Sequence, residues 1–427
     1  MAESRSNSNQ TEYNAGPRGR PWRIALYSHD TMGFGHMRRN TLIARAIAAS
    51  PVRATMLLIA GAREAGSFPL PPETDCLTLP SYYKEDGGAY EPRSLHTPLE
   101  QLTSLRARAT AAALEAFEPD VFIVDKAPRG ALRELEPALE NLRAGGRTQC
   151  VLGLRDVLDD PATIHREWVE GSLAEAVHDY YDAVWVYGDP AVYDQVREYG
   201  YPAHVAAKVH YTGYLARPQR CDFTAAEGDE LRPLLPRSLE RFFLCMVGGG
   251  QDGGELAEAF AQVTFPPETL GVVLMGPFMP KDHQNRLCRF AAANPRLRVV
   301  KFVTDPDLLL SLADRVVAMG GYNTICEALS FGKRTLVVPR VAPRREQLIR
   351  TERLQQMGLL EALYPDRLSP AALAEWLTRD GEAPRIRSSI DLSGAETLPR
   401  LLQNLLGSSA RGARTERLQR DFCHGVS

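Results

Sequence analysis

The sequence has few cysteines, and none of them lies in a pattern that would build a disulfide scaffold or a zinc site. Its seven cysteines are scattered singly over 427 residues, without CxxC pairs or histidine partners at ligand spacing. Long apolar runs are also missing: residues 1–20 lack the apolar core of a signal peptide, and no later segment is long enough to span a bilayer. We therefore expect a cytoplasmic protein in which residues 1–20 form a disordered tail.

An excess of charge of either sign is missing as well. The formal net charge is -3, from 50 basic and 53 acidic residues, so there is no overall positive field to hold nucleic acid. Only residues 411–420 are locally basic, and a solvated terminal helix explains them better than a membrane surface does. We expect no nucleic-acid partner and at most a peripheral contact with a membrane.

What the sequence has is a repeated alternation of short apolar runs and longer amphipathic stretches. This pattern is typical of a parallel sheet covered by helices on both faces, and 427 residues are too many for one compact core, so we expect an α/β fold in two domains. A helix is predicted over 98–117, with Leu99, Leu102, Leu105 and Ala109 on its apolar face. The predicted strands are 22–28, 53–61, 121–125, 150–156, 183–189 and 204–214, then 241–247, 271–276, 297–303, 314–320 and 334–340.

A stretch rich in proline and charge, without this alternation, divides the two halves. The predicted organisation is a tail (1–20), a first domain (21–215), a linker (216–240), a second domain (241–394), and a C-terminal helix and tail (395–427). Ligands of such sheets bind beyond the carboxyl ends of the strands. Functional residues are therefore expected in the loops that follow the strands, facing a cleft between the halves.

The first such loop, HDTMGFGHMRRN, follows the predicted strand 22–28. Its glycines, Gly33 and Gly35 on either side of Phe34, let backbone N–H groups approach a ligand ahead of a helix. His36 comes next, a side chain that can accept a proton near neutral pH. It is the candidate general base. The alternative is a histidine that only caps the helix.

A second glycine loop, VGGGQDGGELAEAF, follows the predicted strand 241–247. Gly248, Gly250 and Gly253 have the G-x-G-x-x-G spacing that suits a diphosphate between a strand and a helix, and Gly249 and Gln251 lie in the same loop. The next predicted strand ends without the acidic residue that holds the ribose of NAD, which argues against an oxidoreductase. The sequence has no Walker A loop, so ATPase chemistry of that type has no support.

The strongest pattern is AMGGYNTICEALSFGKRTLVVPR. Gly320 and Gly321 end a predicted strand. Asn323 and Thr324 are expected to cap the next helix, and Glu327 lies one turn further on. Backbone N–H groups and the Thr324 hydroxyl suit phosphate oxygens, while the Glu327 carboxylate suits paired ribose hydroxyls. The segment therefore predicts a site for a nucleoside diphosphate.

Polar residues follow other predicted strands at the same edge. Glu346 and Gln347, beyond strand 334–340, are candidates for contacts with sugar hydroxyls, although a Gln at such a position is more often simply solvated. Five residues at strand ends of the first half are candidates for contacts with an acceptor, and surface ion pairing explains each of them singly. They are Asp125, Lys126, Arg129, Arg155 and Asp156.

These motifs together resemble the GT-B glycosyltransferases of family 28, the family of the peptidoglycan N-acetylglucosaminyltransferase that forms lipid II. The resemblance is clearest from Arg241 to Gly358, in VGGGQDGG, in the block VKFVTDPDLLLSLADRVVAMGGYNTICEALSFGKRTLVVPR and in the EQ pair that follows. It implies two Rossmann-like domains facing each other across a cleft, and inverting transfer from a nucleotide sugar. The implied donor contacts are Glu327 to the ribose, Gly320, Gly321 and Thr324 near the phosphates, Glu346 and Gln347 to the hexose, and the backbone near Phe302 and Val303 to the base.

The loop GFGHMRR resembles both the GGH loop of those transferases and the GxGHxxR loop of nucleotide-sugar hydrolases that share the fold. In each of these families the histidine is the proposed base, so His36 inherits that role. Where the lipid II enzyme has Asn-Ala after its glutamine pair, this chain has Arg350 and Thr351, which leaves the hexose open. The acceptor domain matches weakly outside its glycine loop.

The expected function is inverting, metal-independent transfer of a hexose from a nucleoside-diphosphate sugar, with a UDP-sugar as the expected donor, to an unidentified hydroxyl acceptor. Helix N-termini and backbone N–H groups are expected to carry the charge of the diphosphate in place of a metal, and no cofactor is expected. The alternatives are a nucleotide-sugar hydrolase in which His36 activates water, more distantly an epimerase, and a non-catalytic nucleotide-sugar sensor.

Overall fold

The computed structural model describes residues 16, 19–30, 35–84, 89–170, 172–216, 234–235, 241–303 and 306–407. The first half is built on a parallel sheet in which the strand order is β3-β2-β1-β6-β7-β8-β9. The order reverses between β1 and β6, which places a topological switch point beside β1. The strands are β1 (Trp22–Ser28), β2 (Ala54–Ala60), β3 (Thr74–Thr78), β6 (Val121–Asp125), β7 (Gln149–Arg155), β8 (Ala183–Tyr187) and β9 (Val209–Tyr211), and a separate hairpin pairs β4 (Tyr82–Lys84) with β5 (Tyr90–Pro92).

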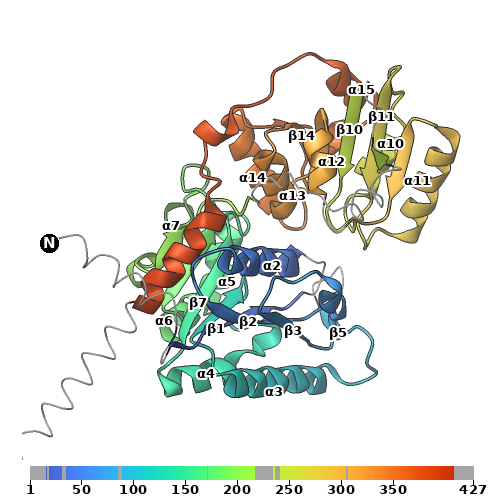
Figure 1. The fold of residues 1–427 in the computed structure, drawn as a ribbon. Helices are drawn as coiled ribbons and strands as arrows, with labels where there is room; N and C mark the ends of the chain where they lie inside the picture. The colour runs from blue at the N-terminus through green and yellow to red at the C-terminus, as the bar shows by residue number, and fades with distance from the viewer. Residues whose placement is uncertain are drawn as a thin grey trace, which may run out of the picture.

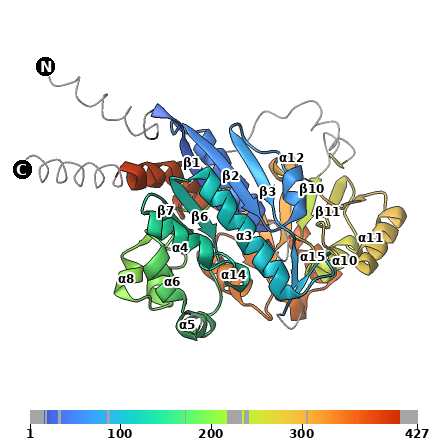
Figure 2. The same ribbon diagram turned by 90° about the horizontal axis from the view of Figure 1, so that it is seen from below.

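Helices cover both faces of this sheet, because successive residues of its buried strands point to opposite sides. On one face Ile24 and Leu26 pack with α2, and on the other Ala25 and Tyr27 pack with α3 and α4. Figures 1 and 2 show α3 and α4 together on one side of the sheet, away from the second half. Figure 1 shows α2 on the side that faces the second half. The helices are α2 (Gly35–Ala48), α3 (Leu99–Phe117), α4 (Glu136–Gly145), α5 (Pro161–Glu170), α6 (Leu173–Tyr180), α7 (Gln195–Glu198) and α8 (Ala203–Ala206), with short 3-10 turns η2 (Arg63–Ser67) and η3 (Ala131–Arg133).

The second half repeats the plan with a parallel sheet ordered β12-β11-β10-β13-β14-β15. Its strands are β10 (Arg241–Met246), β11 (Thr269–Leu274), β12 (Leu297–Val300), β13 (Arg315–Met319), β14 (Arg334–Val338) and β15 (Glu361–Ala362). Its helices are α10 (Gly254–Ala261), α11 (Lys281–Ala293), α12 (Asp307–Leu312), α13 (Tyr322–Ser330), α14 (Glu346–Gln356) and α15 (Pro370–Thr378), with turns η5 (Pro365–Arg367) and η6 (Ile386–Ser388). The two-part α/β architecture expected from the sequence is confirmed.

The chain returns to the first half at its C-terminal end. A helix over residues 394–407 buries Leu398, Leu402 and Leu406 in the same cluster as Trp22 and Ile24. Figure 1 shows this helix, in red, beside the first half rather than beside the sheet that precedes it. The predicted terminal helix therefore joins the two halves. The rest of the predicted tail, the basic residues 411–420 and nearly all of the predicted linker lie outside the described residues.

Three details of the sequence prediction were wrong. The segment 204–214, predicted as one strand, begins with the short helix α8 and continues as β9. The strands β3 and β15 were missed because they are short and partly exposed. On α3, Leu105 is 49% exposed, whereas Arg106 is fully buried and pairs with Glu134 at 2.6 Å. The predicted apolar face of this helix included Leu105 because the buried position is occupied by a charged residue, Arg106.

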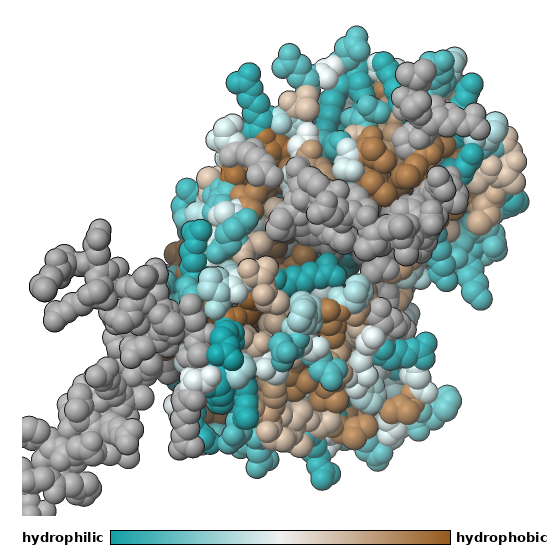
Figure 3. Space-filling view, viewed as in Figure 1, coloured by the Kyte–Doolittle hydropathy of each residue, from teal (hydrophilic) through white to brown (hydrophobic). Residues whose placement is uncertain are grey.

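The surface seen in Figure 3 mixes hydrophilic and hydrophobic side chains over both halves. Large exposed hydrophobic residues, such as Tyr83, Leu312 and Tyr364, are spread over different elements. Isolated residues of this kind are normal on protein surfaces. In the described part of the chain, no helix combines the length and apolarity needed to cross a membrane.

Candidate active site

The glycine loop between β10 and α10 needs glycine at each position of its motif. Gly248 has a φ of +62° and Gly250 a φ of +89°, a region that side chains with a Cβ rarely adopt. A Cβ on Gly250 would lie 2.1 Å from the carbonyl oxygen of Met275, and one on Gly253 would lie 2.3 Å from the side chain of Val247. The motif thus folds the loop tightly and packs α10 against the sheet, which leaves Gly248 and Gly249 exposed.

The N-terminus of α13 lies beside this loop. The predicted caps are wrong: Gly321 is the N-cap, no side chain caps the helix, and Asn323 and Thr324 lie within its first turn. The first N–H groups of a helix have no intrahelical acceptor, so an uncapped end is suited to an anion. The hydroxyl oxygen of Thr324 would lie 3.5 Å from a Cβ on Gly248, so the two glycine segments meet.

A cavity of about 200 Å³ brings residues of both halves together. A hydrogen bond crosses it: the Nδ2 of Asn323, in the second half, donates to the carbonyl oxygen of Gly35, in the first half, at 3.0 Å. The lining residues are Gly35, His36, Arg38, Arg39 and Arg155 from the first half, and Gly248, Gly249, Pro277, Phe302, Gly321, Tyr322, Asn323 and Thr324 from the second. Sequence motifs more than 200 residues apart therefore share one site.

His36 is held in this cavity from two sides. The carboxylate of Asp30, at the end of β1, accepts a hydrogen bond from the backbone N–H of Met37 at 3.0 Å and so fixes the start of α2. The Nδ1 of His36 hydrogen-bonds the carboxylate of Asp125, at the end of β6. Asp125 also accepts two hydrogen bonds from Arg39, at 2.8 and 2.6 Å. The sequence explanation of Asp125 as a surface ion pair is wrong, because its side chain is only 1% exposed.

The protonation states in this cluster favour a neutral histidine. Burial lowers the pKa of His36 to about 4, although the charge of Asp125 acts in the opposite direction. Burial alone would raise the pKa of Asp125, but the charge of Arg39 and the hydrogen bond from His36 hold it well below its usual range. An imidazole that donates its Nδ1–H to a carboxylate keeps its lone pair on Nε2. His36 is therefore able to accept a proton at neutral pH.

Glu327, the predicted ribose ligand, is buried at the edge of this site and faces the first half. Its carboxylate lies 3.4 Å from the Nη2 of Arg38 on α2. Its other oxygen, Oε2, is buried without a hydrogen-bond partner, and so are the Nε and Nη2 of Arg38. The pair is thus a loose charge contact with unused hydrogen-bonding capacity on both sides.

Glu346 and Gln347, the predicted hexose ligands, do not line the cavity. Glu346 begins α14 and pairs with Arg340, while the Gln347 Oε1 accepts the backbone N–H of Arg340 at 3.1 Å. Burial would raise the pKa of Glu346, but Arg155 and Arg340 lower it. Gly320 packs against Gln347 and Thr351 rather than facing the cavity.

Arg350 and Asp156 form a pair that joins the two halves. Arg350 donates two hydrogen bonds to the Asp156 carboxylate, at 2.8 and 2.6 Å, and both side chains are 0% exposed. It also donates to the carbonyl oxygen of Gly320 at 2.9 Å. The sequence explanation of Asp156 as a surface pair is wrong. Arg350, one of the two residues that depart from the family pattern, thus holds the halves together.

The remaining predicted residues are dispersed. Gln251 is exposed outside the cavity lining, Val303 packs against the core of the second half, and Arg129 pairs with Glu136 at 2.9 Å. Gly33 and Phe34 lie outside the described residues. The sequence analysis did not single out Arg38, Arg39 or Tyr322. The two arginines could have been predicted from their position near the start of the helix, two and three residues after His36.

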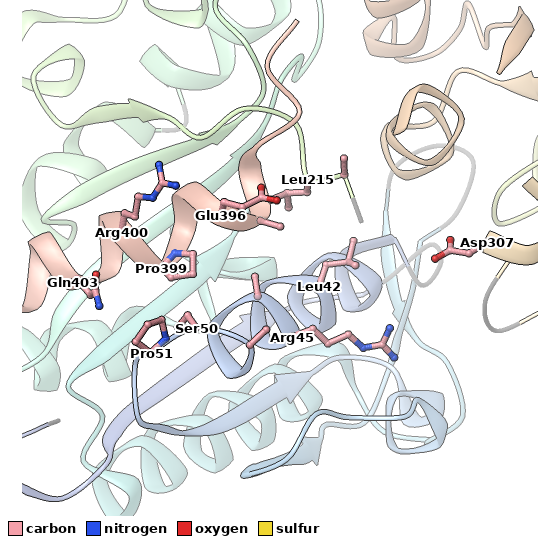
Figure 4. A pocket seen from close by; sticks show the side chains of 14 residues that line it. Leu42, Arg45, Ser50, Pro51, Leu215, Asp307, Glu396, Pro399, Arg400 and Gln403 are labelled. Atoms are coloured by element: carbon pink, nitrogen blue, oxygen red, sulfur yellow. The ribbon is translucent and has the colours of Figure 1, made fainter. Parts of the chain in front are cut away.

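A larger cavity, of about 600 Å³, lies away from this site. Figure 4 shows it between α2 and the C-terminal helix, with Leu42 and Arg45 on one side and Pro399 and Arg400 on the other. None of the predicted site residues lines it. Within the described residues, no group of three or more His, Cys, Asp or Glu side chains is placed to hold a metal ion.

Comparisons with known proteins agree with this geometry. Residues 244–384 match the model of the glycosyltransferase family 28 C-terminal domain, the segment that carries the glycine loop, α13 and α14. No sequence among the curated proteins matches the chain. The chain is a GT-B glycosyltransferase that resembles family 28.

Solved structures establish the fold of this glycosyltransferase over nearly its whole length. A Glycyrrhiza uralensis protein, UGT73P12, complexed with glycyrrhetinic acid 3-O-monoglucuronide, has a TM-score of 0.63 at 10% identity, covering 95% of this chain and 100% of its own. A putative UDP-N-acetylglucosamine 2-epimerase from Listeria monocytogenes has a TM-score of 0.61 at 13% identity, covering 92% and 97%. The glycotransferase of kitacinnamycin has a TM-score of 0.52 at 17% identity, covering 93% and 99%. At such identities the likeness concerns the fold.

Proposed function

We propose that this glycosyltransferase moves a hexose from a nucleoside-diphosphate sugar, with a UDP-sugar as the expected donor, to a hydroxyl acceptor, with inversion at the anomeric carbon. One observation carries the proposal. His36, a half-buried neutral imidazole paired with Asp125, lines the same cavity as the uncapped end of α13 and the exposed glycines Gly248 and Gly249. A base from one half thus faces an anion site from the other.

The donor is proposed to bind on the second half. Its diphosphate meets the N–H groups at Gly248, Gly249 and the first turn of α13, with the Thr324 hydroxyl as a further donor. Glu327 accepts hydrogen bonds from the ribose hydroxyls, and the backbone at Phe302 contacts the base. The hexose contacts of Glu346 and Gln347 stay predictions, carried over from the family resemblance.

The acceptor hydroxyl is proposed to bind beside His36. The Nε2 of His36 takes its proton while the oxygen attacks the anomeric carbon from the face opposite the diphosphate, and the bond to the diphosphate breaks. Asp125 keeps the imidazole in the tautomer that can accept this proton and stabilises the imidazolium that forms. Fixed N–H groups and helix dipoles meet the charge that grows on the leaving diphosphate, so we propose a reaction without metal or cofactor.

A panel experiment tests the proposal. Purified protein is incubated with UDP-, dTDP- and GDP-sugars, with and without a set of hydroxyl acceptors, and the released nucleoside diphosphate and the products are measured. The proposal expects release that depends on acceptor and yields an inverted glycoside. Release that needs no acceptor would identify a hydrolase in which His36 activates water, and saturable binding without turnover would identify a sensor.

A further inference from the structure

The cavity between the halves has an imbalance of charge that the proposed function does not yet use. Among the described residues that line it are three arginines, Arg38, Arg39 and Arg155, and no carboxylate. Arg39 is neutralised by Asp125 behind the cavity. The other two are not matched in this way, so the first half presents excess positive charge toward the glycine loops of the second.

Arg155, at the end of β7, also lacks a complete set of hydrogen-bond partners. Its Nε is buried without a hydrogen-bond partner, although burial lowers the pKa of this side chain and thereby disfavours its charge. An arginine stays protonated in proteins all the same. The charges of Glu346 and Asp156 favour its charged form, but no hydrogen bond reaches its buried Nε. A guanidinium that is only partly matched in this way is costly. Such a group is retained where a ligand supplies the missing anion.

Arg38 lies on α2, directly before Arg39 and two residues after His36. Its partner is Glu327, at 3.4 Å, a distance too long for a good charge-assisted hydrogen bond. Both groups keep buried atoms without a hydrogen-bond partner. Because Glu327 is the proposed ribose ligand, Arg38 stands where the ribose hydroxyls must bind.

The size of the cavity agrees with this arrangement. Its volume of about 200 Å³ is below the range of roughly 300–1,000 Å³ that is usual for small-molecule sites. A nucleotide sugar therefore needs groups to move, and a long arginine side chain held by one loose contact moves more easily than a packed helix. In this arrangement Arg38 occupies the place beside Glu327 that is proposed for the ribose.

We propose that Arg38 and Arg155 form an anion site on the first half that binds the donor's diphosphate opposite the end of α13, and that Arg38 leaves Glu327 when the ribose takes its place. The inference rests on the proposed function. Each phosphate of the donor carries one negative charge, so the two arginines match the diphosphate in charge.

Calorimetric titration of nucleotides tests this inference. UDP, GDP and dTDP are first titrated into the wild-type protein. The diphosphate that binds, and the nucleoside that it contains, are then each titrated into Arg38→Gln and Arg155→Met. Arg45→Gln is the matched control. This substitution removes the same charge from the helix that carries Arg38, but Arg45 lines the larger cavity. Thermal unfolding checks that each variant is folded.

We expect each cavity variant to weaken diphosphate binding about ten-fold or more. Binding of the nucleoside is expected to stay unchanged in Arg155→Met and to stay unchanged or tighten in Arg38→Gln, because Glu327 then has no competing partner. Arg45→Gln is expected to match the wild type. Equal loss for nucleoside and diphosphate, or no loss for either, in folded variants would overturn the inference while leaving the proposed function standing. If the wild type binds none of the three diphosphates, the proposed function fails and takes the inference with it.

Discussion

Two buried arginine–aspartate pairs in this protein have the same geometry and different positions. In Arg39–Asp125 and in Arg350–Asp156, the Nε and Nη2 of the arginine donate to the carboxylate at 2.8 and 2.6 Å. Both guanidinium groups also lie near the ring of Tyr322, at 5.6 and 5.7 Å from its centre. The first pair lies within one half, behind His36. The second joins the two halves.

The difference between these pairs shows that the role of a buried ion pair depends on the groups that it contacts. Breaking a buried pair is costly, yet replacing both partners by apolar groups is often neutral, so the pair alone says little about stability. Asp125 contacts a titrating imidazole that lines the cavity, so its role concerns chemistry. Asp156 contacts groups that stay fully buried, so its role concerns the relative position of the halves.

Breaking the first pair is expected to have the largest effect. Asp125→Asn replaces a carboxylate oxygen by an NH₂ donor, which favours the wrong tautomer of His36. We therefore expect turnover of the folded variant to fall by about 10²–10⁴-fold while donor affinity changes little, in addition to the stability lost when Arg39 is left without its counter-charge. Because Asp125 raises the pKa of His36, the loss also moves the acid limb of the pH profile to lower pH. Steady-state rates and calorimetry measure both effects.

Asp120→Asn is the matched control for this variant. Asp120 pairs with Arg20 in the same half, at 2.8 Å, away from the cavity. Its substitution is expected to leave turnover unchanged. Wild-type turnover in Asp125→Asn would show that Asp125 only packs against the site.

Breaking the second pair is expected to affect stability rather than chemistry. Asp156→Asn leaves Arg350 buried without its counter-charge, which costs about 3–5 kcal/mol of unfolding free energy. The double variant Asp156→Leu/Arg350→Met is expected to recover much of that loss, since no unmatched charge remains. Denaturant unfolding monitored by circular dichroism measures each step of this cycle. Single variants as stable as the wild type would contradict the assignment.

A third pair, Arg38–Glu327, sharpens the comparison because its contact is loose and faces the cavity. Glu327→Ala is expected to weaken donor binding by about 1.5–3 kcal/mol, through loss of the charge-assisted contact to the ribose. Calorimetry with the preferred donor measures the change. Glu375→Ala, on the exposed side of α15, is the control and is expected to bind the donor normally. Unchanged affinity in folded Glu327→Ala would remove Glu327 from the donor site.

The smallest expected effect is that of a chelator. The acidic residue Asp307 ends a D-P-D sequence whose first Asp lies outside the described residues. Asp307 lines the larger cavity (Figure 4) and is not among the residues that line the cavity at His36. If helix ends and arginines carry the diphosphate, EDTA leaves turnover unchanged. Activity that is lost with EDTA and restored by Mg²⁺ or Mn²⁺ would contradict this account.

Local patterns in the sequence predicted the fold well. Apolar runs gave β1 and β6 with their observed bounds, and glycines marked the loops that meet at the cavity. These features depend on neighbouring residues. The strand order and the return of the C-terminal helix to the first half depend on contacts between distant segments, and periodicity carries no information about those.

The polar partners were beyond such reasoning for the same reason. His36 and Asp125 are 89 residues apart, and Asp156 and Arg350 are 194 apart. Each aspartate was noticed at a strand end, but a surface pair was the simpler explanation until the fold placed an arginine against it. From the sequence, Arg38 was only one of two basic residues that follow the candidate base, and nothing predicted its contact with Glu327.

The central claim is that the base belongs to the first half and the glycine loop and helix end that bind the donor belong to the second, and that they meet in one cavity. The most direct test measures donor affinity and turnover for the wild type and His36→Ala across pH. The account predicts that the variant keeps donor affinity and loses about 10²–10⁴-fold in turnover. In the wild type, a protonated imidazole cannot accept a proton, so turnover falls at acid pH. Because burial lowers the pKa of His36, that fall is expected near pH 4 rather than near the usual value of about 6.5. Wild-type rates in His36→Ala, or equal losses of donor affinity and rate, would contradict the account and leave His36 as a structural residue at the start of α2.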